Sequence, residues 1–329
     1  MTGPGDLDDG LAALVLQAAG ARTIVDTQIV QNLWSGYGQI VRLIFNDDST
    51  IICKVIAPSV SAGHPRGWDG DISHRRKVHS YQVERSWYQN HKPLAQVRWP
   101  KCFGQGEEDG IQYIWLEDLD AVGYGFRRSH LDEEGLNSVL RWLGTFHGAT
   151  YNASTEGLWQ QGTYWHLETR PDELQALEDL ELKKVASELD QRLFECPHRS
   201  FVHGDAKVAN FCFSHDNKSV AAVDFQYIGG GVGVQDLAYF FGSCCDENSL
   251  EQTEPWVLDQ YFGYLRESLQ QFHSGVDVDG VERAWRELYD VAWTDFHRFL
   301  KGWSPGHWKL NSYSEKVKTR CLNWLKGQK

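Results

Sequence analysis

Short apolar runs separated by polar turns fill the first third of the chain. Residues 39–45 and 50–57 form two such runs, and the tetrad Asn-Asp-Asp-Ser between them favours a turn, which together predict a β-hairpin. Residues 97–103 and 111–116 predict a second pair of strands. Between the two pairs, apolar residues recur at helical spacing through residues 73–90 and predict a helix.

Two further segments belong to this part of the chain. A helical pattern at residues 7–19 opens with acidic residues, which suit the positive end of a helix. Residues 58–71 are rich in Pro, Gly and Ser and predict a loop.

Beyond residue 119 the apolar spacing becomes mainly helical. Helices are predicted at residues 131–150, 172–194, 249–273 and 281–303, interrupted by short strand-like runs at Ser200–Val202 and at residues 220–225. This order predicts an α+β protein with two lobes. The smaller, strand-rich lobe would comprise residues 1–118, and the larger, mainly helical lobe residues 119–329.

Charge and cysteine content narrow the class of protein. The chain has 45 acidic and 32 basic residues, a net charge of -13, which argues against nucleic acid or an anionic membrane as the main partner and favours a cationic or neutral small molecule. Seven scattered cysteines without C-x-x-C spacing predict reduced thiols. No apolar run reaches the roughly 18 residues of a membrane span, and the first ten residues are acidic. A cytoplasmic protein is expected.

A lysine and a glutamate in the first lobe are candidates for an ion pair. Alternation along residues 50–57 places Lys54 on an apolar strand face, where an anionic partner is expected. Glu84 shares the aromatic face of the helix predicted at residues 73–90 and can supply that partner. The alternatives are a lysine that extends to water from an edge strand and an exposed glutamate.

The stretch F-V-H-G-D-A-K-V-A-N-F at residues 201–211 concentrates polar residues between apolar flanks. Asp205, Lys207 and Asn210 fall in a loop between two short strands, and Asp224 ends the next apolar run. Asn and Asp oxygens are hard ligands that suit Mg²⁺, so Asn210 and Asp224 predict a metal site. Asp205 then remains to accept a hydroxyl proton. Each residue alone is common in turns, but the ordered set is rarely obtained by chance.

These motifs resemble a known fold. The order Lys54, Glu84, H-G-D-A-K-V-A-N at 203–210 and V-D-F-Q at 223–226 is similar to that of the protein-kinase-like superfamily. Within that superfamily, the residues of these motifs resemble those of the aminoglycoside phosphotransferase and choline kinase family, and most closely those of its ecdysteroid-kinase-like (CHK kinase-like) branch. The segment E-D-L at 117–119 resembles the hinge between the two lobes in that branch. The segment G-V-Q-D-L-A at 233–238 resembles the segment that follows the metal-binding motif.

The resemblance implies a role for each of these residues. Lys54, oriented by Glu84, would hold the α- and β-phosphates of ATP. Asp205 would be the catalytic base, and Lys207 would neutralise charge on the transferred phosphoryl group. Asn210 and Asp224 would bind Mg²⁺. The remaining nucleotide contacts would come from the hinge residues Glu117 and Leu119 and from Gly36 and Gly38.

Departures from the protein-kinase pattern favour a small-molecule kinase. Gly204 stands where protein kinases have the arginine that senses activation-loop phosphate, Gln226 replaces the glycine of D-F-G, and no A-P-E follows. Lys207 differs from the bulky residue expected in the ecdysteroid-kinase-like branch. Gly36 and Gly38 are equally explained by a plain hairpin turn.

Some residues near these motifs have competing explanations. His147 and His203 are interpreted as structural, hydrogen-bonded histidines. Residues 293–308 contribute several aromatic residues and Asp295 to a chain with 14 tryptophans. They are either core or, as in choline kinases, an aromatic and acidic wall for a quaternary ammonium.

The sequence thus predicts an ATP- and Mg²⁺-dependent kinase acting on a hydroxyl of a small molecule. The alternatives are a catalytically silent nucleotide-binding or scaffold protein and a kinase that phosphorylates proteins. The acceptor is open among choline-like amines, aminoglycosides, steroid alcohols and sugars. The oligomeric state is open as well.

Overall fold

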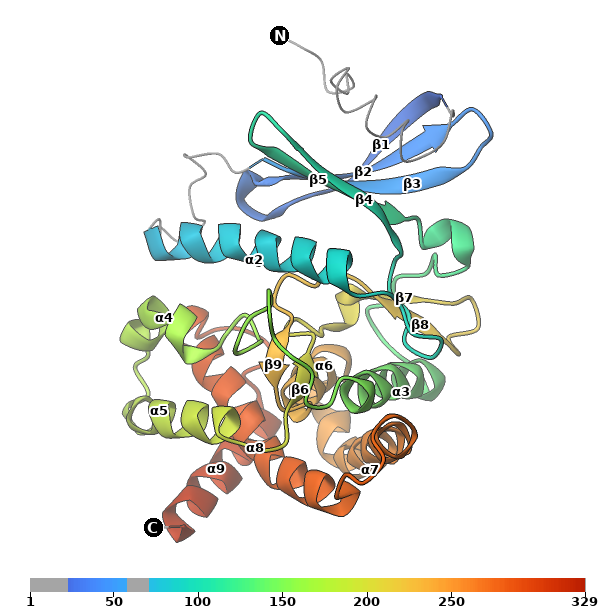
Figure 1. The fold of residues 1–329 in the computed structure, drawn as a ribbon. Helices are drawn as coiled ribbons and strands as arrows, with labels where there is room; N and C mark the ends of the chain where they lie inside the picture. The colour runs from blue at the N-terminus through green and yellow to red at the C-terminus, as the bar shows by residue number, and fades with distance from the viewer. Residues whose placement is uncertain (1–22, 58–70, 329) are drawn as a thin grey trace.

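The computed structural model describes residues 23–57 and 71–328. A strand-rich part lies above a larger helical part, and helix α2 runs along the face of the sheet between them (Figure 1). The predicted two-lobed α+β architecture is confirmed. The helix predicted at residues 7–19, and the loop predicted at 58–71 except for Asp71, lie outside the described residues.

The upper part is one five-stranded antiparallel sheet in the order β1-β2-β3-β5-β4. Its strands are β1 (Ile24–Asn32), β2 (Gly38–Phe45), β3 (Thr50–Ile56), β4 (Cys102–Glu108) and β5 (Ile111–Glu117), and α2 (Asp71–Asn90) lies against it. Strand β3 is central, with β2 and β5 on its two sides, and in this register Lys54 lies opposite Ile40 and Ile114. Lys54 is therefore not on an edge strand.

Two details of the sheet differ from the sequence-based expectation. The strand predicted at residues 97–103 begins only at Cys102 and continues to Glu108. Pro100 lacks the backbone N–H needed for a ladder, and Arg98 instead bridges to Ala221 of the lower part. Strand β1 was missed because it is mostly exposed and mixes polar and apolar residues without a clear alternation.

The lower part contains seven described α-helices. They are α3 (Glu133–Ala149), α4 (Pro171–Ala176), α5 (Leu180–Phe194), α6 (Val234–Cys244), α7 (Glu247–Phe272), α8 (Val278–Trp303) and α9 (Ser312–Gly327). The single helix predicted at residues 172–194 is two helices, because Leu177 adopts an extended conformation and the side chain of Asp179 caps a new start by accepting from Leu182 N. Helix α6 was missed because almost all of its residues are buried, which leaves no polar face to reveal a helical period.

Two small antiparallel sheets support the loops that carry the polar motifs. Strand β6 (Ser200–Val202) pairs with β9 (Gly229–Gly231), and β7 (Phe211–Phe213) pairs with β8 (Val220–Ala222). The strand predicted at 220–225 ends at Ala222 because Asp224 adopts a left-handed conformation with φ of 70°.

Aromatic packing joins α2 to the lower part. Trp87 of α2 is buried and stacks on Phe225, with ring centroids 5.0 Å apart, and it also meets the edges of Phe146 and Phe201. All seven cysteines are free thiols, as predicted. In the described part of the chain, no helix combines the length and apolarity that crossing a membrane requires.

Candidate active site

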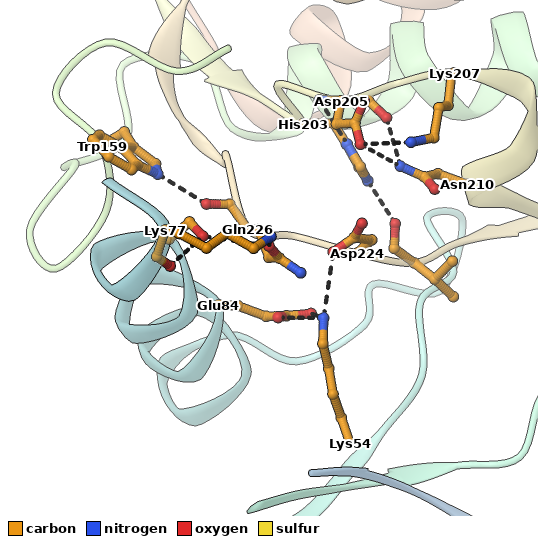
Figure 2. A network of polar contacts seen from close by, with 12 residues as sticks. Lys54, Lys77, Glu84, Trp159, His203, Asp205, Lys207, Asn210, Asp224 and Gln226 are labelled. Carbon is orange, nitrogen blue, oxygen red and sulfur yellow. Dashed lines mark hydrogen bonds and ion pairs between the residues drawn. The ribbon is translucent and has the colours of Figure 1, made fainter. Parts of the chain in front are cut away.

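Lys54 and Glu84 form a buried ion pair. The ammonium of Lys54 lies 2.6 and 2.9 Å from the two carboxylate oxygens of Glu84, and 3.4 Å from Oδ1 of Asp224 (Figure 2). Only 4% of Lys54 and 1% of Glu84 are exposed, so both alternatives considered from the sequence are wrong. Burial opposes the charge on Lys54, but Glu84 and Asp224 outweigh burial and raise its pKa. The ammonium is therefore charged and fixed at the edge of a cavity.

The loop between β6 and β7 holds Asp205, Lys207 and Asn210 together. Lys207 Nζ lies 3.1 Å from Oδ2 of Asp205. Asn210 Nδ2 donates to the same oxygen at 3.0 Å and to the backbone oxygen of Asp205 at 2.8 Å. Asp205 is 7% exposed and lines the cavity. These contacts fix the direction of its carboxylate.

Two buried residues hold this loop in place. Asp236 in the first turn of α6 accepts from the backbone N–H of His203 at 2.5 Å and of Gly204 at 2.9 Å. His147 Nε2 lies 3.1 Å from the same carboxylate, and His147 Nδ1 is hydrogen-bonded to the hydroxyl of Tyr261. The structural interpretation of His147 agrees with these contacts. Asp236 itself was not assigned a role, although an acid inside an apolar helical segment is a recognisable signal.

His203 connects the loop to the segment that carries Asp224. Its Nδ1 accepts from the backbone N–H of Asp205, so Nε2 carries the proton and donates to the backbone oxygen of Val223 at 3.0 Å. Gly204 has φ of 79°, and a Cβ there would lie 2.1 Å from the backbone oxygen of Tyr227. The loop therefore requires glycine at the position where protein kinases carry arginine.

Asn210 and Asp224 lie beside each other. The backbone N–H of Val223 donates to the backbone oxygen of Asn210 at 2.9 Å, which joins the two segments. The side chain of Asp224 is about one-third exposed, towards the cavity. Burial raises its pKa, but the positive charges of Lys54, Lys207 and Lys77 have the larger effect and hold the pKa at about 2.

Within the described residues, no group donates to Oδ1 of Asn210. One carboxylate and one amide oxygen facing the cavity fit a hard divalent cation that keeps waters and binds phosphates.

One cavity of about 1110 Å³ brings these residues together. Lys54, Glu84, Asp205, Lys207, Asn210 and Asp224 all line it. The predicted hinge lies on its wall as well. The carboxylate of Glu117 is paired with Arg98 at 2.5 Å, whereas Leu119 lines the cavity and, within the described residues, its backbone N–H has no acceptor.

Gly36 and Gly38 do not line the cavity. Gly36 lies in the β1–β2 turn and Gly38 begins β2; a hydrogen bond from Leu33 N to Gly38 O closes the turn. A Cβ on Gly38 would lie 2.0 Å from the backbone oxygen of Val55. Close approach between the strands therefore explains Gly38. Trp34 of the same turn does line the cavity.

Aromatic side chains form part of the cavity wall near Asp205. Of the segment 293–308, Phe296, Trp303 and Trp308 line the cavity. Asp295 does not; it is buried and paired with Arg298 at 2.8 Å. The aromatic part of the wall considered from the sequence is therefore present, but Asp295 does not contribute an acid to it.

Two solved structures share this architecture over nearly the whole chain. A microcompartment-associated aminopropanol kinase matches 96% of this chain and 94% of its own, with a TM-score of 0.52 and 14% sequence identity. A protein assigned as a fructosamine-3-kinase from Thermobifida fusca YX-ER1 matches 96% of this chain and 97% of its own, with a TM-score of 0.50 and 14% identity. Likeness at this level of identity establishes the fold, and this chain has the protein-kinase-like fold.

The sequence comparison points to one branch of that fold. Residues 160–274, about a third of the chain, match the ecdysteroid kinase-like family, and this stretch contains Asp205, Asn210 and Asp224. No curated protein matches the chain in sequence. The resemblance inferred from the motifs is confirmed. The lobe boundary at residues 118 and 119 and the roles of the individual site residues stay predictions.

Proposed function

We propose that this protein is a kinase that transfers the γ-phosphoryl group of ATP, with Mg²⁺, to a hydroxyl of a small organic molecule. The observation that carries this proposal is the convergence of three polar groups on one cavity: the Lys54–Glu84 pair, the oxygens of Asn210 and Asp224, and the oriented carboxylate of Asp205. Phosphoryl transfer depends mainly on such positioning and charge stabilisation.

The nucleotide would bind between the sheet and the lower part. Lys54, held by Glu84, is placed to pair with the α- and β-phosphates. The adenine would lie beside the hinge, where Glu117 is fixed by Arg98 and where the backbone N–H of Leu119 has no acceptor in the described part of the chain. Gly36 and Gly38 would shape the turn that covers the phosphates. In this proposal residues 1–118 form the nucleotide-binding lobe and residues 119–329 the catalytic and acceptor-binding lobe.

Asn210 and Asp224 would hold the metal ion. Bound there, Mg²⁺ would supply positive charge against the phosphate oxygens. The low pKa of Asp224 keeps its carboxylate ionised and ready as a ligand. Lys54 Nζ lies 3.4 Å from Asp224 Oδ1, so in this proposal the metal ligands would lie next to the group that binds the phosphates.

Asp205 would bind the acceptor hydroxyl and take its proton. Asn210 and Lys207 hold the carboxylate in one orientation, which reduces the reorganisation that the reaction needs. Lys207, 40% exposed, can turn towards the transferred phosphoryl group. The seven free cysteines fit a reducing compartment, and we place the enzyme in the cytoplasm.

The test is the Asp205→Ala variant. We expect transfer to fall by roughly 10²–10⁴-fold, the usual contribution of a general base, while the affinity for Mg²⁺ and AMP-PNP stays within about twofold of wild type. ATP consumption would be measured over a library of hydroxyl-bearing metabolites, and nucleotide affinity by calorimetry. Asp216→Asn, at an exposed turn between β7 and β8, is the matched control.

Two outcomes would contradict the proposal. Full transfer by Asp205→Ala would remove the assignment of the base. Tight nucleotide binding by wild type without ATP consumption for any acceptor would favour the silent nucleotide-binding alternative.

A further inference from the structure

A lysine that the proposed reaction does not use lies against the aromatic part of the cavity wall. Lys309 follows α8, and its ammonium lies 4.3 Å from the ring centroid of Tyr239, 5.4 Å from that of Phe296 and 5.6 Å from that of Trp308. All four residues line the cavity. The ammonium is thus held against ring faces, an arrangement that cation–π attraction stabilises.

Lys309 differs from the other lysines that line the cavity. Lys54 is paired with Glu84 at 2.6 Å, Lys207 with Asp205 at 3.1 Å, and Lys77 donates to Oε1 of Gln226 at 2.6 Å. Among the described residues, no carboxylate or other acceptor lies within hydrogen-bonding distance of Lys309 Nζ. Its charge is therefore available to a ligand.

The acids that line the cavity are already paired. Glu117 and Asp118 are bound by Arg98 and Arg42. The other three, Glu84, Asp205 and Asp224, contact Lys54 or Lys207. The described lining therefore offers no unpaired acid.

Two arginines add positive charge to the cavity wall. Arg76 lines the cavity and donates to the backbone oxygen of Thr169 and to Ser73, neither of which carries charge. Arg170 also lines it and is paired with Glu173.

We propose, building on the proposed kinase function, that the acceptor is a hydroxy acid: its carboxylate pairs with Lys309, and its apolar or ring body packs on Phe296 and Trp308. A choline-like or polycationic acceptor would have to displace Lys309 from the rings and would meet no free acid in return. The overall charge of -13 suggested a cationic or neutral ligand, but charges spread over the surface are screened beyond about 10 Å, whereas Lys309 would contact the ligand directly.

The experiment compares matched acceptors that differ only in charge. Sets of primary alcohols on one ring scaffold would carry a carboxylate, a carboxamide or a trimethylammonium group, beginning with 4-(hydroxymethyl)benzoate and its amide and ammonium counterparts. A larger hydroxy-compound library would be sorted in the same three classes. Affinities would be measured by calorimetry with Mg²⁺ and AMP-PNP present, for wild type, Lys309→Met, Lys309→Arg and the exposed control Lys316→Met.

The proposal predicts that the tightest ligands are carboxylates. Lys309→Met should weaken them roughly ten- to a hundredfold, as expected for a charge-assisted contact, and should leave the carboxamides within about twofold, since these do not need the charge. Lys309→Arg should restore most of the affinity, and Lys316→Met should behave as wild type. Tighter binding of the cationic or neutral sets, carboxylate binding indifferent to Lys309→Met, or no binding by any carboxylate would each overturn the proposal.

Nucleotide titrations separate this failure from failure of the kinase proposal. If Mg²⁺ and AMP-PNP bind wild type but not Lys54→Met, the kinase proposal stands whatever the acceptor sets show. If Lys54→Met binds nucleotide as wild type does, the kinase proposal fails, whatever the acceptor measurements show. Thermal unfolding of each variant would verify that it is folded.

Discussion

At the scale of single residues, burial determines what each polar side chain of the cavity can do. Lys54 and Glu84 are nearly inaccessible and satisfy each other, so neither can be removed alone without leaving a buried charge or an unpaired polar group. Lys309 is only partly buried, and aromatic ring faces, not an acid, stabilise the charge of its ammonium. Two lysines of one cavity wall therefore differ in what holds them: Lys54 is fixed in an ion pair, and Lys309 lies against aromatic rings.

The Lys54–Glu84 pair gives a prediction that separates stability from function. Lys54→Met should lower the free energy of unfolding by about 3 kcal/mol, because Glu84 loses its partner. The double variant Lys54→Met/Glu84→Leu should recover most of that loss, since an apolar pair replaces a buried ionic one. Urea unfolding measures stability, and AMP-PNP titration should show weak binding for both variants. A double variant no more stable than Lys54→Met would contradict the prediction.

Lys309 gives a prediction about pH. Burial lowers its pKa to about 8; Asp205 and Cys244 oppose this effect and Lys207 adds to it. Between about pH 8 and 10.5 the unfolded chain binds more protons at this lysine than the folded chain does, so stability should rise with pH in that window. Relative to Lys309→Met, wild type should gain ~2 kcal/mol between pH 7 and 10. Urea unfolding of both proteins at several pH values tests this, and a difference that does not change with pH would refute it.

At the scale of elements, the loop between β6 and β7 depends on the first turn of α6, whose Asp236 does not line the cavity. Asp236 at the start of α6 binds two successive backbone N–H groups of this loop. His147 of α3 and Tyr261 of α7 extend this network. Three helices thus determine where Asp205 points, through residues that lie outside the cavity lining.

Asp236→Asn should impair this positioning. An amide presents one acceptor oxygen where the carboxylate presents two, so one loop N–H loses its partner. We expect kcat to fall on the order of 10²-fold, the effect of an error of about 1 Å in geometry. Hydrogen exchange of the loop amides should increase while nucleotide affinity is kept.

The matched control is Asp246→Asn, which caps α7 by accepting from Asn248 N and Ser249 N at an exposed site. It should cost only about 0.5 kcal/mol of stability, because Asn caps a helix about as well as Asp and only the interaction of the charge with the helix dipole is lost, and it should leave kcat unchanged. Equal loss of kcat in both variants would show that the effect of Asp236 is not specific.

At the scale of the whole molecule, the cavity is made by both parts of the fold. Lys54 comes from the sheet, Glu84 from α2, and Asp205 and Asp224 from loops of the lower part, as Figure 2 shows. The packing of Trp87 on Phe225 fixes α2 against the segment next to Asp224. A ligand that contacts both parts should therefore stabilise the molecule as a unit.

Mg²⁺ together with AMP-PNP should raise the stability of the full chain. At a ligand concentration of 100 times Kd the expected gain is about 2.7 kcal/mol, visible as an increase in Tm. EDTA should remove most of this gain, and Asp224→Asn should make the nucleotide effect nearly independent of Mg²⁺. An equal increase in Tm with and without Mg²⁺ would contradict the assignment of Asn210 and Asp224.

The sequence was informative where motifs are local. The alternation that placed Lys54 on the same face as Ile52 and Ile56 is present in the structure, and so is its pairing with Glu84. Failures occurred where local patterns are weak. Strand β1 is mostly exposed, α6 is buried on all sides, and the strand predicted at residues 97–103 is displaced because Pro100 interrupts the ladder.

By itself, the sequence determined the α+β class, the order of the two parts and six polar residues of the cavity, because each of these residues stands in a local pattern that marks it. They are Lys54, Glu84, Asp205, Lys207, Asn210 and Asp224. The tertiary structure alone decided that Asp236 supports the β6–β7 loop and that Lys309 occupies the aromatic wall beside Tyr239. The physical reason is that both contacts join residues more than 30 positions apart, where the balance of burial and charge depends on packing that no local pattern specifies.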